Sequence, residues 1–138
     1  MPIHTIEFRL STDGDADVVE ITERAQAAVT EAGAGEGQAS VFVRGSTAAI
    51  TTMEYEPGGI HDLQALLDRL IPVEGEYEHN RLNHDTNSHA HQRASLIGPS
   101  EVVPILGGRL ALGTWQQVVL IDFDDRPRER TVVVQVVS

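Results

Sequence analysis

The spacing of apolar residues along the chain predicts a series of short strands and few helices. Period-two alternation or short apolar runs predict strands at residues 4–10, 39–43, 47–53, 101–106, 109–112, 116–123 and 130–137. Helical spacing predicts a helix from Val18 up to Gly33, an amphipathic helix over 60–70 that ends at Pro72, and a short third helix over 90–97.

Turn residues separate these elements. Gly107–Gly108 suits a two-residue hairpin turn, Pro57–Gly58–Gly59 predicts a turn, and Arg44–Gly45 predicts a hairpin between the strands at 39–43 and 47–53. Helices are few and connections are short, which favours antiparallel sheets over repeated βαβ units. We therefore expect one α+β domain over residues 1–138, with mainly antiparallel sheets in a sandwich-like arrangement.

Composition narrows the classes of function. The net charge of −11 argues against a nucleic-acid partner, because phosphate backbones require a basic surface. The chain has no cysteine, and all ten of its basic residues are arginine, which removes thiolate, lysine Schiff-base and Walker-type phosphate-loop chemistry. No apolar run approaches the ~20 residues of a membrane span, and no leader is evident, so we expect a cytoplasmic protein without a membrane partner.

Residues 77–95 (YEHNRLNHDTNSHAHQRAS) hold four of the six histidines: His79, His84, His89 and His91. No pair among them has the spacing of three or four residues that would place two ligands on one helix face. A metal site would therefore be assembled from separate elements, and histidine with carboxylate ligands suits zinc, manganese or iron. An acid–base site and a solvated polar loop remain open alternatives.

Other candidates are single residues with two interpretations each. Glu54 ends a strand, where catalytic carboxylates and surface carboxylates are both common, and Asp62 could either orient a histidine or complement the helix dipole. Trp115 either packs in the core or contacts a ligand beside Gly113. Ser100 offers a hydroxyl at a tight turn. Arg128 and Arg130 share a strand face and could clamp phosphate or balance the acidic surface.

Several segments together resemble the YjbQ family of secondary thiamine-phosphate synthases. They are STAAITTMEYEP, HDLQALLDRLIP, YEHN, AHQRASLIGPS, VVPILGGRLALGTWQ and PRERTVVVQV. The resemblance runs from about Val41 to the C-terminus, whereas residues 1–40 match in layout only. It implies a small α+β protein that assembles as a homotrimer and joins a pyrimidine diphosphate to a thiazole phosphate, giving thiamine phosphate.

The resemblance also implies site residues. Positions matching the family's candidate catalytic groups are His79, His91, Glu54 and Asp62. Positions matching a phosphate or ligand site are Ser100, Thr114, Trp115, Gln116 and Arg128. A divalent metal, zinc or magnesium, would be bound by His79 and His91.

One family position differs in this chain. The histidine that precedes the Thr-Thr-Ala motif in the family is Gly45 here. His84 or His89 is a candidate replacement. The alternative is a degenerate member of the family, a non-catalytic trimer that binds a metal or an anion.

Overall fold

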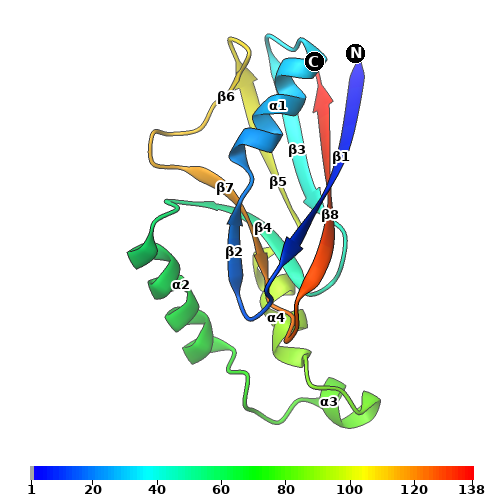
Figure 1. Cartoon of the computed structure of the whole chain (residues 1–138), viewed down its shortest axis with the longest axis vertical. Helices are drawn as coiled ribbons and strands as arrows, with labels where there is room; N and C mark the ends of the chain where they lie inside the picture. Colours follow the sequence, from blue (N-terminus) through cyan, green and yellow to red (C-terminus); the bar gives the residue numbers. More distant parts are fainter. Residues whose placement is uncertain (1) are drawn as a thin grey trace.

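Two antiparallel β-sheets form the body of the molecule, as the alternating pattern predicts (Figure 1). The structure is a computed structural model and describes residues 2–138. In spatial order, the five-stranded sheet consists of β1 (Ile3–Thr12), β8 (Arg128–Val137), β3 (Gly37–Val43), β5 (Ser100–Leu106) and β6 (Arg109–Leu110). The three-stranded sheet consists of β2 (Asp17–Glu20), β7 (Gln117–Asp122) and β4 (Ala48–Met53).

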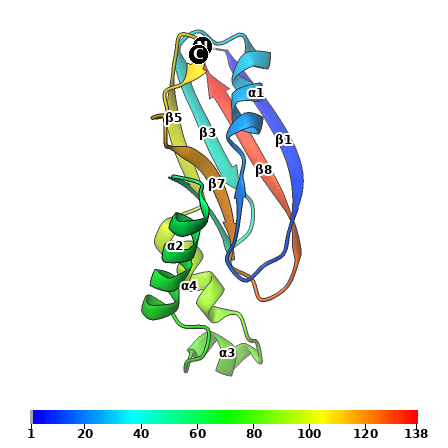
Figure 2. The same ribbon diagram turned by 60° about the vertical axis from the view of Figure 1, so that its left-hand side comes forward.

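The helices gather at two ends of this β body. They are α1 (Thr22–Ala32), α2 (Pro57–Leu70), α3 (Glu78–Asn83) and α4 (Ser88–Ile97). Helix α1 lies across the five-stranded sheet near the end that holds both termini, whereas α2, α3 and α4 lie at the opposite end (Figures 1 and 2). Within residues 2–138, no helix is long and apolar enough to span a bilayer.

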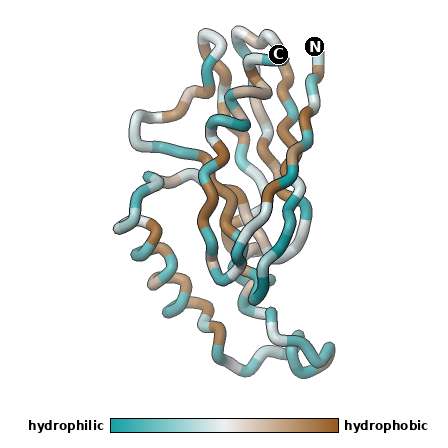
Figure 3. The backbone as a smooth tube through the Cα atoms, in the orientation of Figure 1, coloured by the Kyte–Doolittle hydropathy of each residue, from teal (hydrophilic) through white to brown (hydrophobic). Residues whose placement is uncertain are grey.

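Strand β7 divides the apolar core into two clusters. Val118 and Leu120 belong to the larger cluster, which includes residues of α1 and the five-stranded sheet, whereas Val119 and Ile121 belong to a smaller one with residues of α2 and α4. Successive side chains of a strand point to opposite faces. Strand β7 is therefore buried on both faces, which explains its continuous apolar sequence. Figure 3 shows apolar residues along the strands, whereas the region of α3 is hydrophilic.

Two sequence-based predictions at the N-terminal half are wrong. The helix predicted from Val18 begins only at Thr22, because residues 17–20 form β2, where Val18 pairs with Ile121 of β7. Sheet pairing overrides the helical spacing at that point. The predicted hairpin about Arg44–Gly45 is absent, because β3 pairs with β5 and β8 while β4 pairs with β7. The segment around Gly45 instead carries the chain from one sheet to the other.

Other boundaries follow local chemistry. The Gly107–Gly108 turn joins β5 to β6 with φ of 58° and 78°, as the hairpin prediction requires. Pro57–Gly58–Gly59, predicted as a turn, is the first turn of α2. The Glu56 carboxylate caps that turn by accepting from the Gly58 and Gly59 N–H groups. The third predicted helix begins at Ser88, and α3 is a short helix that the periodicity did not predict.

Candidate functional site

His79 and His91 lie side by side, although they belong to different helices. Their ring centroids are 4.6 Å apart and their planes are tilted by 56°. Helix α3 ends at Asn83 and is capped by His84, whose backbone is left-handed at φ 51°. After this reversal, the Ser88 N–H donates to Asn80 Oδ1 at 3.0 Å and ties the start of α4 to α3. The turn between the helices thus brings the two histidines together.

Asn87 determines which nitrogen of His79 carries a proton. Its Nδ2 donates to Asp124 Oδ1 at 3.4 Å, and its Oδ1 lies 3.1 Å from His79 Nε2. An ionised carboxylate only accepts, so the NH2 group of Asn87 faces Asp124 and its oxygen faces His79. His79 Nε2 is therefore the protonated nitrogen, and Nδ1 is the acceptor of the neutral ring. Asp85 Oδ2 lies 3.6 Å from the same Nε2.

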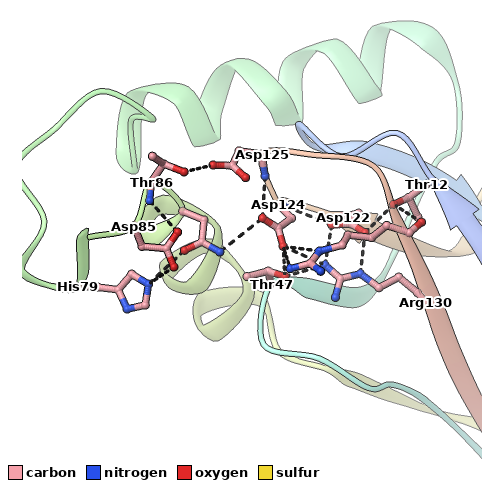
Figure 4. Close-up of polar contacts among 11 residues, drawn as sticks. Thr12, Thr47, His79, Asp85, Thr86, Asp122, Asp124, Asp125 and Arg130 are labelled. Atoms are coloured by element: carbon pink, nitrogen blue, oxygen red, sulfur yellow. Dashed lines mark hydrogen bonds and ion pairs between the residues drawn. The ribbon is translucent and has the colours of Figure 1, made fainter. Parts of the chain in front are cut away.

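Two carboxylates with fully buried side chains, Asp122 and Asp124, connect this pair to the body of the sheet (Figure 4). Asp122 accepts from Arg130 Nε at 2.7 Å, from Arg130 Nη2 at 2.8 Å and from Thr12 Oγ1 at 2.6 Å. Asp124 accepts from Arg128 Nε at 2.8 Å and from Thr47 Oγ1 at 3.1 Å.

The environment of Asp124 keeps its carboxylate ionised. Burial opposes the charged form, but hydrogen bonds from Arg128, from the Asp125 N–H and from Thr47, together with the Arg128 charge, outweigh it. The pKa of Asp124 is consequently held well below its ordinary value. A permanent carboxylate here fixes the Asn87 amide and, through it, the His79 tautomer.

Both arginines of the last strand already have carboxylate partners. Arg130 binds Asp122 through two nitrogens and is buried, whereas the Arg128 side chain is 39% exposed beside Asp124. The two arginines considered as a phosphate clamp are therefore part of an ion-pair network. Of the two, Arg128 has the more accessible side chain.

The residue beside the Cβ position of Gly45 is Arg130 rather than His84 or His89. Within residues 2–138, the atoms that a Cβ on Gly45 would approach within 4 Å are Arg130 Nη1, at 2.7 Å, and Arg130 Cζ, at 3.8 Å. Gly45 also has φ of 117°, which side chains rarely tolerate. The Arg130 guanidinium is thus the group beside Gly45.

The predicted carboxylates Glu54 and Asp62 stand apart from the histidine pair. Glu54 is exposed after β4 and lines a 370 Å³ recess with Thr51, Thr52, Met53, Gly59, Leu63 and Ile97. The side chain of Asp62 is 86% exposed on α2, and its Oδ1 lies 3.4 Å from His61 Nδ1. One chain therefore does not bring all four predicted catalytic residues into contact.

The remaining predicted ligand residues are all accessible. Thr114, Trp115 and Gln116 lie in the loop between β6 and β7, and Trp115 is 72% exposed, so it is not a core residue. Gln116 accepts from the Gly113 N–H at 3.0 Å and donates to Thr52 Oγ1 at 3.1 Å, which holds this loop beside β4. Ser100 is exposed as the first residue of β5.

The two extra histidines have different environments. His84 is an exposed residue at the end of α3, whereas His89 is 1% exposed and its Nδ1 has no hydrogen-bond partner within residues 2–138. Burial, reinforced by the Arg93 charge, lowers the pKa of His89 despite nearby Asp125, Asp15 and Asp124. His89 is therefore a neutral side chain at neutral pH.

Sequence reasoning did not single out Asn87, Asp122 or Asp124. A signal was present in LIDFDDRPRER, where two carboxylates two residues apart precede two arginines two residues apart across a turn. Because residues two apart share a strand face, this pattern is consistent with a buried ion-pair ladder. The role of Asn87 depends on tertiary contacts and left no comparable pattern.

The side chains of one chain do not assemble a three-ligand zinc site within residues 2–138. Within residues 2–138, no group of three or more His, Asp or Glu side chains is placed to hold a metal ion. Zinc sites in proteins ordinarily have at least three protein ligands. In addition, His79 Nε2 is occupied by its contact with Asn87.

The fold and the histidine site define a small α+β protein whose candidate site lies where short helices meet the end of a β body. The chain belongs to the YjbQ-like UPF0047 protein family, whose model matches residues 6–138. This confirms the resemblance found in the sequence.

Relatives and solved structures agree with this assignment. A UPF0047 protein from Methanothermobacter thermautotrophicus is 35% identical over 136 residues, covering 99% of this chain and 93% of the relative. A YbjQ-like protein of unknown function from Sulfolobus solfataricus has a TM-score of 0.92 at 30% identity, covering 98% of this chain and 96% of that one. A YjbQ/UPF0047 protein from Clostridium acetobutylicum has a TM-score of 0.87 at 38% identity, covering 96% and 99%.

Proposed function

We propose that this protein is a small-molecule enzyme of the YjbQ type that uses His79 and His91 for acid–base chemistry on a phosphorylated substrate. The observation that carries the proposal is the contact of the two rings at 4.6 Å with the His79 tautomer held by Asn87. A solvated surface loop would not need a buried carboxylate, acting through Asn87, to orient one of its histidines. Positioned histidines are the commonest groups for proton transfer near neutral pH.

The reaction we assign is the joining of a pyrimidine diphosphate to a thiazole phosphate. The thiazole nitrogen forms a bond to the methylene carbon of the pyrimidine, and the bond from that carbon to the diphosphate oxygen breaks. Diphosphate leaves with the electron pair. In our assignment His91 donates a proton to this leaving group, and His79 positions the His91 ring. General acid catalysis of this kind contributes roughly 10²- to 10⁴-fold in rate.

Accessible residues near the ends of β4 and β7 support the binding of a heterocyclic substrate. Trp115 presents an exposed indole, and the Gln116–Thr52 bond keeps its loop beside the recess that Glu54 lines. Indoles stack on planar rings, and a carboxylate accepts from an amino substituent. Asp62, Ser100, Thr114 and Arg128 remain candidate contacts of the substrate.

Product formation tests the proposal directly. Purified protein is incubated with the two phosphorylated substrates, and thiamine phosphate is measured for wild type, His91→Asn and His84→Asn. His84→Asn is the matched control, since Asn tolerates the left-handed backbone of that exposed position. We expect product from wild type and the control and a loss of roughly 10²-fold or more for His91→Asn. Absence of product from wild type would refute the assigned reaction.

Gly45 favours a second candidate, a non-catalytic trimer that binds a metal or an anion. The chain lacks the family's histidine at this position, and Arg130 stands beside it instead. The metal version requires ligands from a second chain, because one chain lacks three suitable groups within residues 2–138. Metal content after dialysis against zinc separates the two candidates. Stoichiometric zinc that His91→Asn removes, with no product from wild type, would favour the second.

Exposed apolar residues support the proposed homotrimer. Phe42 of β3 is 41% exposed, and Val102 and Leu106 of β5 are 53% and 60% exposed on neighbouring strands of one sheet. Contiguous apolar patches on small proteins commonly mark interfaces. Light scattering tests this proposal: we expect the mass of three chains, and substitution of Val102 by Glu should lower it. A monomer at micromolar concentration would contradict it.

A further inference from the structure

A recess opens where the family's histidine is replaced by Gly45. It has a volume of 150 Å³ and is lined by Gly45, Ser46, Ala48, Ala94, Ser95 and Pro99. Pockets for whole drug-sized ligands measure about 300–1,000 Å³. The recess therefore has room for one chemical group of a ligand rather than for a complete substrate.

A guanidinium nitrogen with unused hydrogen-bonding capacity lies beside this recess. Arg130 is 7% exposed, and its Nε and Nη2 are bound to Asp122 and Thr47. Its Nη1 makes no hydrogen bond to another residue of 2–138, and it is the atom that would lie 2.7 Å from a Cβ on Gly45. Within residues 2–138, the side-chain nitrogens that are fully enclosed and have no hydrogen-bond partner are His4 Nε2 and His89 Nδ1. Arg130 Nη1 is not one of them, so it retains access to solvent.

The backbone beside Gly45 adds further donors. Within residues 2–138, the N–H groups of Gly45, Ser46 and Thr47 make no backbone hydrogen bonds, although the Arg44 N–H before them donates to Thr131 at 3.1 Å. Consecutive unpaired N–H groups in a turn can form a concave site that binds an anion. Ser46 and Ser95 are among the residues that line the recess, and each carries a hydroxyl group.

Local charge does not oppose an anion at this place. Asp122 and Asp124 carry two negative charges, which Arg128 and Arg130 balance through their ion pairs. The net charge of −11 over the whole chain is largely screened beyond about 10 Å at 0.1 M salt. Binding of a small oxyanion here would therefore depend on the few polar groups of a recess that is otherwise lined by Ala48, Ala94 and Pro99.

The recess also lies next to the histidine pair. Ser95 follows His91 by four residues on α4, and residues at that spacing are neighbours on one helix face. Thr47 links Arg130 to Asp124, which binds the Asn87 amide beside His79. A group held in the recess would thus be one helical turn from His91.

The geometry points to an anion subsite at this recess, in which the N–H groups of Gly45 and Ser46 and the hydroxyls of Ser46 and Ser95, with Arg130 Nη1 beside Gly45, bind the phosphoryl group of the substrate. This inference rests on the proposed function for the identity of the substrate. It assigns Gly45 a role: the absence of a side chain leaves room for the Arg130 guanidinium, which supplies positive charge beside the recess.

Binding of inorganic phosphate, measured by isothermal titration calorimetry, tests the subsite without any turnover. We expect saturable binding by wild type, about threefold weaker binding by Ser95→Ala, and at least about tenfold weaker binding by Ser95→Leu, which fills the recess. Ser11→Ala, on the exposed side of β1, should bind as wild type does. Ser95 is exposed, so these variants should fold, and their melting temperatures check this.

The outcomes separate the subsite from the reaction. Equal phosphate affinity for wild type and Ser95→Leu, or no saturable binding by wild type, would overturn the subsite. Binding that depends on Ser95 and persists in His91→Asn supports it, even if no thiamine phosphate forms and the proposed reaction fails. If product does form, an unchanged KM of Ser95→Leu for both substrates would overturn the subsite and leave the reaction standing.

Discussion

His79 Nε2 lies 3.1 Å from Asn87 Oδ1, and this contact connects a half-buried histidine to a fully buried carboxylate. The amide orientation follows from Asp124, so the tautomer of His79 depends on a residue of the turn between β7 and β8. Buried charged groups therefore fix the orientation of a candidate site that lies nearer the surface.

The Asp122–Arg130 ion pair should be essential for stability. Asp122→Asn leaves the buried Arg130 charge without its carboxylate, and we expect a loss of about 3–5 kcal/mol in the free energy of unfolding. Glu129→Gln, which removes the exposed Arg9–Glu129 pair between β1 and β8, should cost no more than about 1 kcal/mol. Urea denaturation measures both. Equal, small losses would show that the buried pair is not a structural support.

Asp124 should make the protein sensitive to acid. Its folded pKa is lowered, so the unfolded chain takes up a proton at a pH where the folded chain does not. The stability it contributes is complete above the unfolded pKa of about 3.9 and is lost as the pH falls toward the folded pKa. We expect Asp124→Asn to flatten the decline of the unfolding free energy between pH 5 and 3. An unchanged decline would mean that other carboxylates dominate.

His89 should contribute to a decline at milder pH. Burial lowers the pKa of His89 in the folded chain. The His89 ring of the unfolded chain therefore binds a proton below about pH 6.5, whereas the ring in the folded chain binds one only at lower pH. His89→Leu also removes a buried Nδ1 that has no partner within residues 2–138. We expect this variant to lose less stability than wild type between pH 7.5 and 5. The exposed His84→Asn should follow wild type, and the prediction fails if His89→Leu does so too.

Gly45 should resist substitution. A side chain there meets a left-handed backbone at φ 117° and the pinned Arg130 guanidinium, so we expect Gly45→Ala to cost about 1–3 kcal/mol. Gly35→Ala is the control, because its Cβ would meet no atom within 4 Å and its φ is ordinary. Thermal unfolding of the two variants provides the comparison. Similar melting temperatures would indicate that the backbone at Gly45 relaxes easily.

Local patterns predicted most of the elements. They failed where pairing with residues distant in the sequence decides which secondary structure forms. Residues 109–110 and 117–122 were recognisable as strands, and the Gly107–Gly108 turn needed only its own backbone preference. Val18 has helical spacing with later residues, yet it pairs with Ile121, more than a hundred residues away. Periodicity contains no information about such a partner.

The candidate site shows the same division. The matched positions His79 and His91 are adjacent in space, as the family resemblance implied for a shared site. By contrast, the carboxylate network behind them includes Asp124, thirty-seven residues from Asn87, and no local motif indicates that contact. The environment of Gly45 likewise depends on Arg130, which reaches it only through the pairing of β8 with β3.

A double-mutant cycle on the histidine pair tests the central claim most directly. The rate of thiamine phosphate formation is measured for wild type, His79→Asn, His91→Asn and the double variant. If the two rings form one acid–base unit, the double variant should be no slower than the slower single variant, because residues that act together are strongly non-additive. The account would be contradicted if the rate losses of the two single variants multiplied in the double variant, or if both single variants reacted at the wild-type rate.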